Sequence, residues 1–275
     1  MSHAEDQSPE ALLAQHVAKN ERLRHRNWQV KFRLVWGGVL AILVLFIVAS
    51  LNVEFAFIER STPFILAGIG LTILVSFLSI TLATLLAALG ALGRLSTNAV
   101  ANAVASFYVS FFRGTPLILQ LLFWYLALPQ LGVVLDPVIC AVGALGMNYG
   151  AYMTEIFRAG IQAVPIGQRE AAVALGMSER TAFSRIIAPQ AFRIVVPAIG
   201  NDFIAMLKDS ALASTVSLQE ILWRAQNVGR REFKTLQTFL IAAMVYWVLT
   251  IVFTAIQNRI ESRLAAGDRN KAVKG

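Results

Sequence analysis

Long apolar runs recur along the chain and are separated by short polar segments. A bilayer core of about 30 Å needs about 20 mainly apolar residues in a helix. Six runs approach or exceed that length: residues 34–51, 64–92, 101–128, 137–157, 194–216 and 236–256. The pattern predicts an all-α integral membrane protein with six transmembrane helices, and the polar segments between the runs are the loops.

Composition supports this class. Hydrophobic residues make up 57% of the chain and charged residues 15%, against roughly 45–50% and about 25% in soluble domains. The net charge of +8 does not indicate nucleic-acid binding, because the basic residues flank the apolar runs. If most of the 24 Lys and Arg lie on the cytoplasmic side, both termini are cytoplasmic. The external segment before the last run, with Arg224, Arg230, Arg231 and Lys234, is an exception.

One long polar segment, residues 160–192, lies on the predicted cytoplasmic side. Pro165 suits the entry of a helix and Gly176 suits the left-handed residue after a helix end, so a short helix is predicted over residues 168–175. Ser178 can cap a second, amphipathic helix, and Pro189 is predicted to limit it. A helix–turn–helix of this kind is a candidate docking element, and an ordinary surface loop is the alternative.

Charged residues within two of the runs indicate a polar passage, since charges are costly in hydrocarbon. Arg113 and Lys208 are each about 11 residues, or roughly 16 Å, into their runs. Each lies beside a sequence that interrupts a helix, RGTP or KDS. Gln120 follows Arg113 by seven residues and is expected on the same helix face. Arg113 could bind a carboxylate and Asp209 an ammonium group, which suits a zwitterion. Structural ion pairs within the bundle are the alternative.

The sequence gives little support for ATP hydrolysis, metal binding or enzymatic catalysis by this chain. No G-x-x-x-x-G-K-[ST] motif occurs, so the chain is not expected to hydrolyse ATP. The three His lie in the first 25 residues and the single cysteine, Cys140, lies in an apolar run. A metal centre or a membrane enzyme is therefore not expected. Gly146 and Gly150 have the spacing that allows close helix packing.

Four motifs together resemble those of a known family. They are Glu170-Ala171-Ala172 followed by Leu175-Gly176, Ile187, Pro189 and Pro197; RGTPLILQ from Arg113 to Gln120; Tyr152-Met153-Thr154-Glu155; and Lys208-Asp209-Ser210-Ala211-Leu212. This combination is similar to the EAA-loop permease subunits of ATP-binding-cassette (ABC) importers, and within them to the polar amino acid uptake family. The resemblance covers about residues 64–260.

The resemblance implies a five-helix type I importer core in residues 60–258, with a coupling loop at 160–192 that docks on a separate ATPase subunit. Residues 34–58 are then an additional first helix, and residues 1–33 and 259–275 are cytoplasmic tails. ATP and Mg would be bound by the ATPase and no cofactor by this chain. The implied partners are a second permease subunit, an external substrate-binding protein and an amino acid, at the inner membrane of a bacterium.

By the same resemblance and the depth argument, the candidate residues fall into three groups. Substrate binding is assigned to Arg113, Gln120, Lys208, Asp209 and Ser210; a gate or ion pair to Glu155; and ATPase coupling to Glu170, Ala171, Ala172 and Gly176. Two other hypotheses remain open at this point. One is an ABC permease for another small polar solute such as an opine. The other is an ion-coupled secondary transporter that uses Asp202 or Asp209.

Overall fold

The computed structural model describes residues 24, 27–39, 41–42, 45 and 54–272, and every regular element among them is helical. The chain forms two compact units, Met1–Phe55 and Ala56–Gly275. In the first unit, residues 27–39 are helical and the rings of Trp28 and Phe32 stack at 5.3 Å. Most of the predicted tail 1–33 and much of the predicted first helix 34–58 lie outside the described residues.

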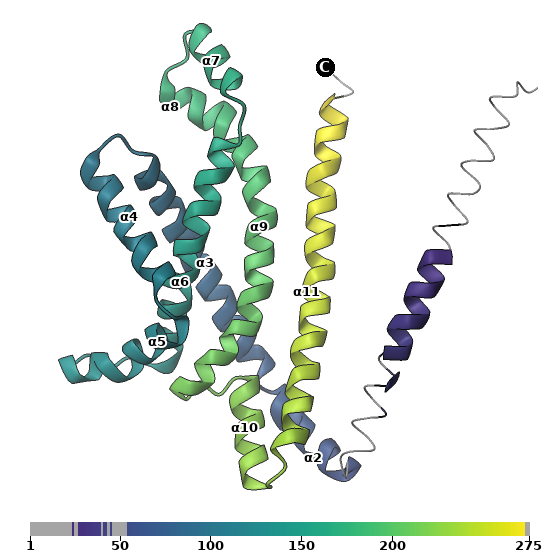
Figure 1. Cartoon of the computed structure of the whole chain (residues 1–275). Coiled ribbons are helices and arrows are strands. Elements are labelled where there is room, and N and C mark those ends of the chain that lie inside the picture. Colours follow the sequence, from purple (N-terminus) through teal and green to yellow (C-terminus); the bar gives the residue numbers. More distant parts are fainter. Residues whose placement is uncertain (1–23, 25–26, 40, 43–44, 46–53, 273–275) are drawn as a thin grey trace, which may run out of the picture. The chain divides into compact units, whose positions relative to one another are not determined.

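The second unit contains the elements shown in Figure 1. In chain order they are α2 (Phe55–Leu66), α3 (Ile69–Leu95), α4 (Ala99–Gly114), α5 (Leu117–Leu122), η1 (Phe123–Ala127), η2 (Leu128–Leu131), α6 (Pro137–Gln162), α7 (Ile166–Ala174), α8 (Glu179–Ala182), η3 (Phe183–Ile187), α9 (Ala188–Asp209), η4 (Ser210–Val216), α10 (Ile221–Arg231) and α11 (Thr235–Ala272).

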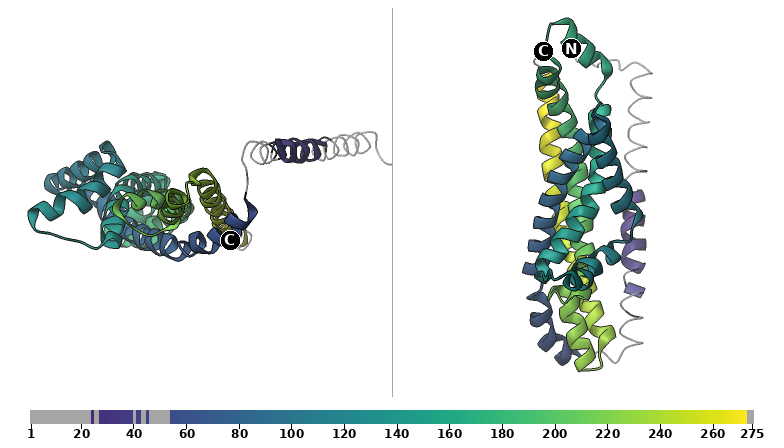
Figure 2. Two further views of the ribbon diagram at one scale, coloured as in Figure 1. Left: turned by 90° about the horizontal axis from the view of Figure 1, so that it is seen from below. Right: turned by 90° about the vertical axis from the view of Figure 1, so that its left-hand side faces the viewer.

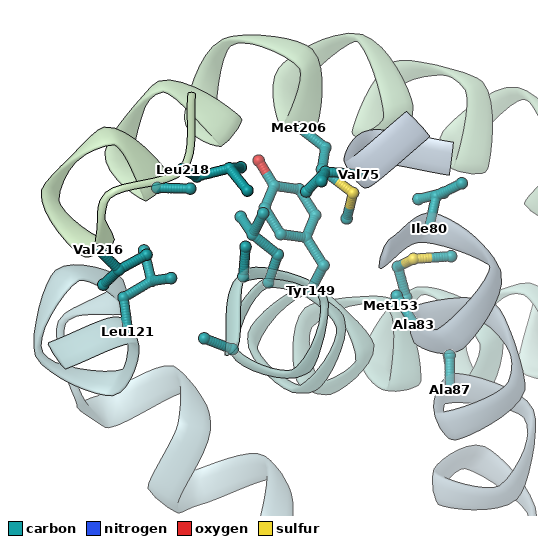
Figure 3. Close-up of a cluster of buried hydrophobic side chains, with 14 residues drawn as sticks. Val75, Ile80, Ala83, Ala87, Leu121, Tyr149, Met153, Met206, Val216 and Leu218 are labelled. Atoms are coloured by element: carbon teal, nitrogen blue, oxygen red, sulfur yellow. The ribbon is translucent and has the colours of Figure 1, made fainter. Parts of the chain in front are cut away.

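Helix α6 is the centre of this unit and packs most extensively on α3. Small residues bring the two helices together: a Cβ at Gly146 would lie 2.6 Å from the Leu82 side chain, and one at Gly150 would lie 3.0 Å from Leu86 Cβ. The predicted role of this glycine pair in close packing is confirmed. Around the contact, α3, α6, α9 and η4 contribute buried apolar side chains to one cluster (Figure 3).

A second cluster joins α10 to the start of α11 and to the end of α2 through Ile65, Ile221, Ala225 and Ala242. The contact is close, because a Cβ at Gly68 would lie 2.5 Å from the backbone nitrogen of Ile221. Glu220 is fully buried at the start of α10. Its carboxylate accepts hydrogen bonds from the backbone N–H of Trp223, at 2.8 Å, and from the hydroxyl of Tyr246 on α11.

Three helical stretches in the described part of the chain are long and apolar enough to cross a membrane: Phe55–Leu95, Glu179–Val216 and Thr235–Arg263. The bent pair Ala99–Gly114 and Leu117–Leu131 would make a fourth. The predicted count of six is therefore not confirmed. Helix α6 falls outside these four, although it covers the predicted run 137–157. It is enclosed by its neighbours, with thirteen buried residues, and a central helix can carry more small and polar residues than one that faces lipid.

The predicted run 101–128 is not one straight helix. The chain bends by 102° between α4 and the stretch that begins with α5. The bend falls at Thr115 and Pro116, both of which have extended backbone angles. Pro116 disfavours the helical conformation at Thr115 and offers no N–H to continue the helix, which explains the break.

Candidate functional site

The break between α4 and α5 leaves carbonyl groups at the end of α4 without helical hydrogen-bond donors. The side-chain amides of two buried residues, Gln120 and Asn148, donate to these carbonyl groups instead. Gln120 Nε2 donates to the carbonyl oxygens of Phe112, at 3.0 Å, and Thr115, at 3.2 Å. Asn148 Nδ2 on α6 also donates to the Phe112 oxygen, at 2.9 Å. Unpaired backbone groups are costly away from water, so these bonds stabilise the bend.

A cavity of about 900 Å³ opens beside the bend. It lies between the end of α4, the middle of α6 and the last turns of α9. Its walls are Arg113, Gly114, Thr115, Pro116, Leu117, Asn148, Tyr149, Tyr152, Glu155, Ile156, Arg158, Ala159, Asp202, Ala205 and Asp209. Charged and aromatic side chains from three helices thus face one space, as expected for a site that binds a polar ligand within a bundle.

Three charged residues of the cavity wall come from α4 and α9: Arg113, Asp202 and Asp209. Asp209 accepts a hydrogen bond from the hydroxyl of Tyr149, at 2.7 Å. The Arg113 guanidinium lies 5.1 Å from the centre of the Tyr152 ring, within the range of a cation–π contact. The Oδ2 atom of Asp202 is buried and accepts no hydrogen bond from the described part of the chain.

At the wall of the cavity nearer to the polar loop, Glu155 joins two arginines. Arg94 of α3 lies 3.2 Å from Glu155 Oε1, and Arg158, one turn along α6, lies 2.7 Å from Oε2. Arg94 also donates to the hydroxyl of Ser106 on α4. These contacts of Glu155 and Arg94 connect three helices, α3, α4 and α6. The role of Glu155 as a gate stays a prediction.

The structure brings together some of the proposed substrate residues and separates others. Arg113 and Asp209 line the cavity with Glu155. Lys208 is exposed and is not part of the cavity wall, and Ser210 is buried with its hydroxyl bonded to the Leu207 carbonyl. The expected shared face of Gln120 and Arg113 is wrong, because the 102° bend lies between them. Gln120 instead holds the bend.

Tyr149 and Tyr152 complete the site and were not among the candidates from sequence. Both precede Glu155 on α6, and both line the cavity. Tyr152 lies four residues from Asn148 and three from Glu155. The i, i+3 and i+4 spacing of these polar residues on an otherwise small-residue helix was the available signal.

At the other end of α9, the polar loop forms the predicted helix–turn–helix (Figure 2). Gly176 has a φ of +75°, as expected after the end of α7. Ser178 Oγ accepts from the Thr181 N–H at 3.3 Å, and Arg169 pairs with Glu179 at 2.7 Å. Of the proposed coupling residues, Glu170, Ala171 and Gly176 are exposed. Ala172 is buried, at 1% exposure, so it packs inside the loop and does not present a surface.

The second helix of the loop does not stop at Pro189 as predicted. It continues through the π-helical turn η3 into α9, and Glu179–Val216 forms one helical stretch. The wider turn precedes Pro189 directly, with the Ala188 N–H bonded to the Phe183 oxygen. This widening relaxes the clash that a proline ring makes with the preceding turn. The loop is therefore continuous with the helix that carries Asp202 and Asp209.

Residues 79–266 match the family described as the binding-protein-dependent transport system inner membrane component. The chain belongs to this family. It is thus a membrane permease subunit, whose ATPase is a separate subunit, and not an enzyme. The family assignment supports the importer hypothesis over the ion-coupled alternative.

The permease is similar along most of its length to curated relatives. It is 38% identical over 219 residues to the arginine transport system permease protein ArtQ of Bacillus subtilis (strain 168), covering 79% of this chain and 100% of the relative. It is 40% identical over 203 residues to the L-cystine transport system permease protein TcyB of the same organism, covering 74% and 87%.

A solved structure, the crystal structure of an amino acid ABC transporter with histidines, superposes on the permease with a TM-score of 0.74. The two are 37% identical, and the match covers 78% of this chain and 100% of the other. The fold is therefore that of a type I ABC importer permease.

Proposed function

We propose that the chain forms the substrate passage of an ATP-driven amino acid importer and that the cavity beside the α4–α5 bend is its substrate site. The observation that carries this proposal is the cavity itself, which has Arg113 on one wall and Asp202 and Asp209 on another. Arg113 can pair with an α-carboxylate in bidentate fashion and Asp209 with an α-ammonium group. The relatives named for arginine and L-cystine and the amino acid transporter structure support the same substrate class.

The charges of the cavity further favour an amino acid with an additional cationic group. The Glu155 carboxylate pairs with both Arg158 and Arg94. Apart from the Glu155–Arg158 pair, the charged residues on the cavity wall are Arg113, Asp202 and Asp209. One cation and two carboxylates complement a ligand with one carboxylate and two cations. Such a ligand would also offset the cost of the buried Asp202 oxygen, which accepts no hydrogen bond from the residues that the structure describes.

The loop 160–192 is, in this proposal, the coupling element. Its exposed Glu170, Ala171 and Gly176 would lie against the partner ATPase, which would hold ATP and Mg. Two exposed apolar residues, Ile166 in α7 at 74% and Leu175 directly after α7 at 80%, add contact area. Because the loop runs without interruption into α9, a movement of the ATPase would shift Asp202 and Asp209 relative to Arg113 on α4.

The proposed orientation places the loop and both termini in the cytoplasm of a bacterium, and α10 with the start of α2 on the external side. Two permease subunits, identical or related, would enclose the passage, and an external substrate-binding protein would deliver the amino acid.

The test is reconstitution of the permease with candidate ATPase and substrate-binding proteins in liposomes. Uptake of labelled arginine, lysine, glutamine and glutamate is measured with and without internal ATP. We expect ATP-dependent uptake in which arginine or lysine exceeds glutamate. Uptake driven by an ion gradient without the ATPase would overturn the importer proposal, and preferential uptake of glutamate would overturn the charge argument alone.

A further inference from the structure

The turn between α10 and α11 presents an exposed surface that the passage does not use. Arg230, Arg231 and Phe233 form it, and we refer to these three residues as the outer patch. Both arginines are exposed, and Phe233 is 94% exposed. The outer patch lies at the opposite end of the second unit from the loop 160–192 (Figures 1 and 2).

The backbone at Phe233 is unusual for a phenylalanine. Its φ is +56°, in the left-handed region that disfavours side chains. The N–H of Lys234 donates to the Gly229 carbonyl at 2.9 Å, and the N–H of Glu232 donates to the Val228 carbonyl at 3.0 Å. This pattern ends α10 with a left-handed residue, a position that glycine normally occupies. The close approach of α11 fixes the turn, since a Cβ at Gly229 would lie 2.9 Å from Thr235 Cα.

The turn holds this backbone conformation, but the Phe233 ring gains little from the described part of the chain. At 94% exposure the Phe233 ring buries almost no surface, and the residue precedes the apolar stretch of α11, which begins at Thr235. A strained residue that makes no internal contact is often retained for a function. A large exposed aromatic side chain close to two arginines is typical of a protein-binding surface, where aromatic residues and Arg are enriched.

The composition and charge of the outer patch suit an acidic protein surface as the ligand. In the proposed orientation the outer patch is external, so its arginines do not contribute to the cytoplasmic excess of positive charge that orients membrane proteins. Between them and Phe233 lies Glu232, which is exposed and pairs with Arg60 at 3.3 Å. Because Arg60 offsets the charge of Glu232, Arg230 and Arg231 leave the patch positive, and arginines beside an aromatic anchor suit a protein interface.

From this combination we infer that the outer patch is a docking point for an acidic surface of the external substrate-binding protein. The inference rests on the proposed function. Phe233 is the apolar anchor, and Arg230 and Arg231 pair with carboxylates of the partner. The patch is also connected to the substrate site. Helix α10 is fixed to α11 by Glu220 and Tyr246, and η4, which packs on α10, follows directly from Asp209.

Two variants test the inference in the assembled transporter. Phe233→Gly removes the ring and relieves the strained backbone, so a structural role predicts unchanged or better behaviour. Arg230→Gln with Arg231→Gln removes both charges. The probe is the labelled binding protein that stimulates ATP hydrolysis by the wild-type transporter, measured in nanodiscs. We expect each variant to weaken its binding about tenfold, with basal ATP hydrolysis and expression unchanged. The arginine variant should also lose most of the salt dependence of binding.

Matched controls separate the possible outcomes. Ser217→Gly also places glycine at an exposed left-handed residue, with φ +63°, and Arg259→Gln with Arg263→Gln removes two exposed charges at the other end of α11. Neither should change binding more than twofold. Equal binding by wild type and both outer-patch variants would overturn the inference and leave the proposed function intact. An effect confined to nanodiscs with phosphatidylglycerol would assign the patch to lipid and overturn it too. If no binding protein stimulates the wild type, the proposed function fails, and the inference with it.

Discussion

At the scale of single residues, neighbouring positions on α9 have different environments. Asp209 lines the cavity and accepts a hydrogen bond from Tyr149, whereas Lys208 beside it is exposed outside the cavity wall. A helix turns about 100° per residue, so adjacent side chains point in different directions. The KDS segment therefore contributes one group to the site, and this difference provides a matched pair of substitutions.

Asp209→Asn keeps the shape of the side chain and an oxygen that can accept from Tyr149, but removes the charge. We expect the substrate concentration for half-maximal uptake to rise about tenfold or more, because a charge-assisted hydrogen bond to the ammonium group is lost. Lys208→Gln removes a charge one residue away and should change that concentration by less than about twofold. Uptake by reconstituted liposomes measures both. An equal effect of the two variants would contradict the assignment of Asp209 to the site.

Glu220 provides a prediction about pH. It lies outside the membrane-spanning helices, and burial raises the pKa of its carboxyl above the usual value, although hydrogen bonds from Tyr246 and from backbone N–H groups oppose the shift. A carboxyl with a raised pKa in the folded state stabilises the fold at pH values below its unfolded pKa, and this contribution is lost as pH rises through the folded pKa.

The variant Glu220→Gln lacks this titration while its amide oxygen can still accept from the Trp223 N–H. We expect the thermal stability of the wild type relative to the variant to be greatest near pH 4 and to decrease as pH rises towards 8. Unfolding in detergent, followed across this pH range, measures the difference. A stability difference that does not change with pH would show that Glu220 does not titrate in the folded protein.

The candidate site residues could be predicted from the sequence where the prediction depended on local residue spacing. They could not be predicted where it depended on the direction of the chain in space. Arg113, Asp209 and Glu155 were recognised because charge within an apolar run is rare. A straight helix would place Gln120 beside Arg113, which is why the sequence assigns it to substrate binding. Because the chain bends at Pro116, the Gln120 amide instead donates to a carbonyl at the end of α4. Tyr149 and Tyr152 carry no charge, so their spacing on α6 is a weak signal, and the packing of α6 against α4 and α9 shows that they line the cavity.

At the scale of elements, the loop 160–192 is the best-predicted part of the chain. Its caps and glycine turn are encoded within a few residues, which is why Pro165, Gly176 and Ser178 were sufficient. The continuation of its second helix through Pro189 was not predictable in the same way. It requires the π turn η3, and no local sequence rule for that turn was available.

Gly176 allows a test of the loop with a matched control. Its φ is +75° and nothing lies within 4 Å of the position of a Cβ, so Gly176→Ala introduces backbone strain of about 1–2 kcal/mol without a clash. We expect the turn to rearrange and the stimulation of ATP hydrolysis by substrate-loaded binding protein to fall. Gly167→Ala, also in open space but within α7 and without a positive φ, should leave stimulation unchanged. A normal response in the Gly176 variant would contradict a coupling role for the turn.

At the scale of the whole molecule, the fold links two distant sites through α9. One end of this helix continues from the loop 160–192, the proposed coupling element, and the other carries Asp202 and Asp209. A rigid connection needs lateral support where Pro197 weakens the helix. The support comes from α11: Gln257 is buried and its amide donates to the Pro197 carbonyl at 3.2 Å. The contact is close, because a Cβ at Gly200 would lie 3.0 Å from the Gln257 side chain.

Gln257→Leu keeps most of the volume and removes this hydrogen bond, so α9 could bend at Pro197 when the loop moves. We expect substrate binding to persist while the amount of amino acid transported per ATP hydrolysed falls about threefold or more. Thr250→Val on the same helix is the control, because the Thr250 hydroxyl donates to the Tyr246 carbonyl of its own helix, at 2.8 Å. Parallel measurement of uptake and ATP hydrolysis in liposomes gives the ratio. A variant that transports with the wild-type ratio would show that α9 transmits the movement without support at Pro197, and coupling would then depend on the helix alone.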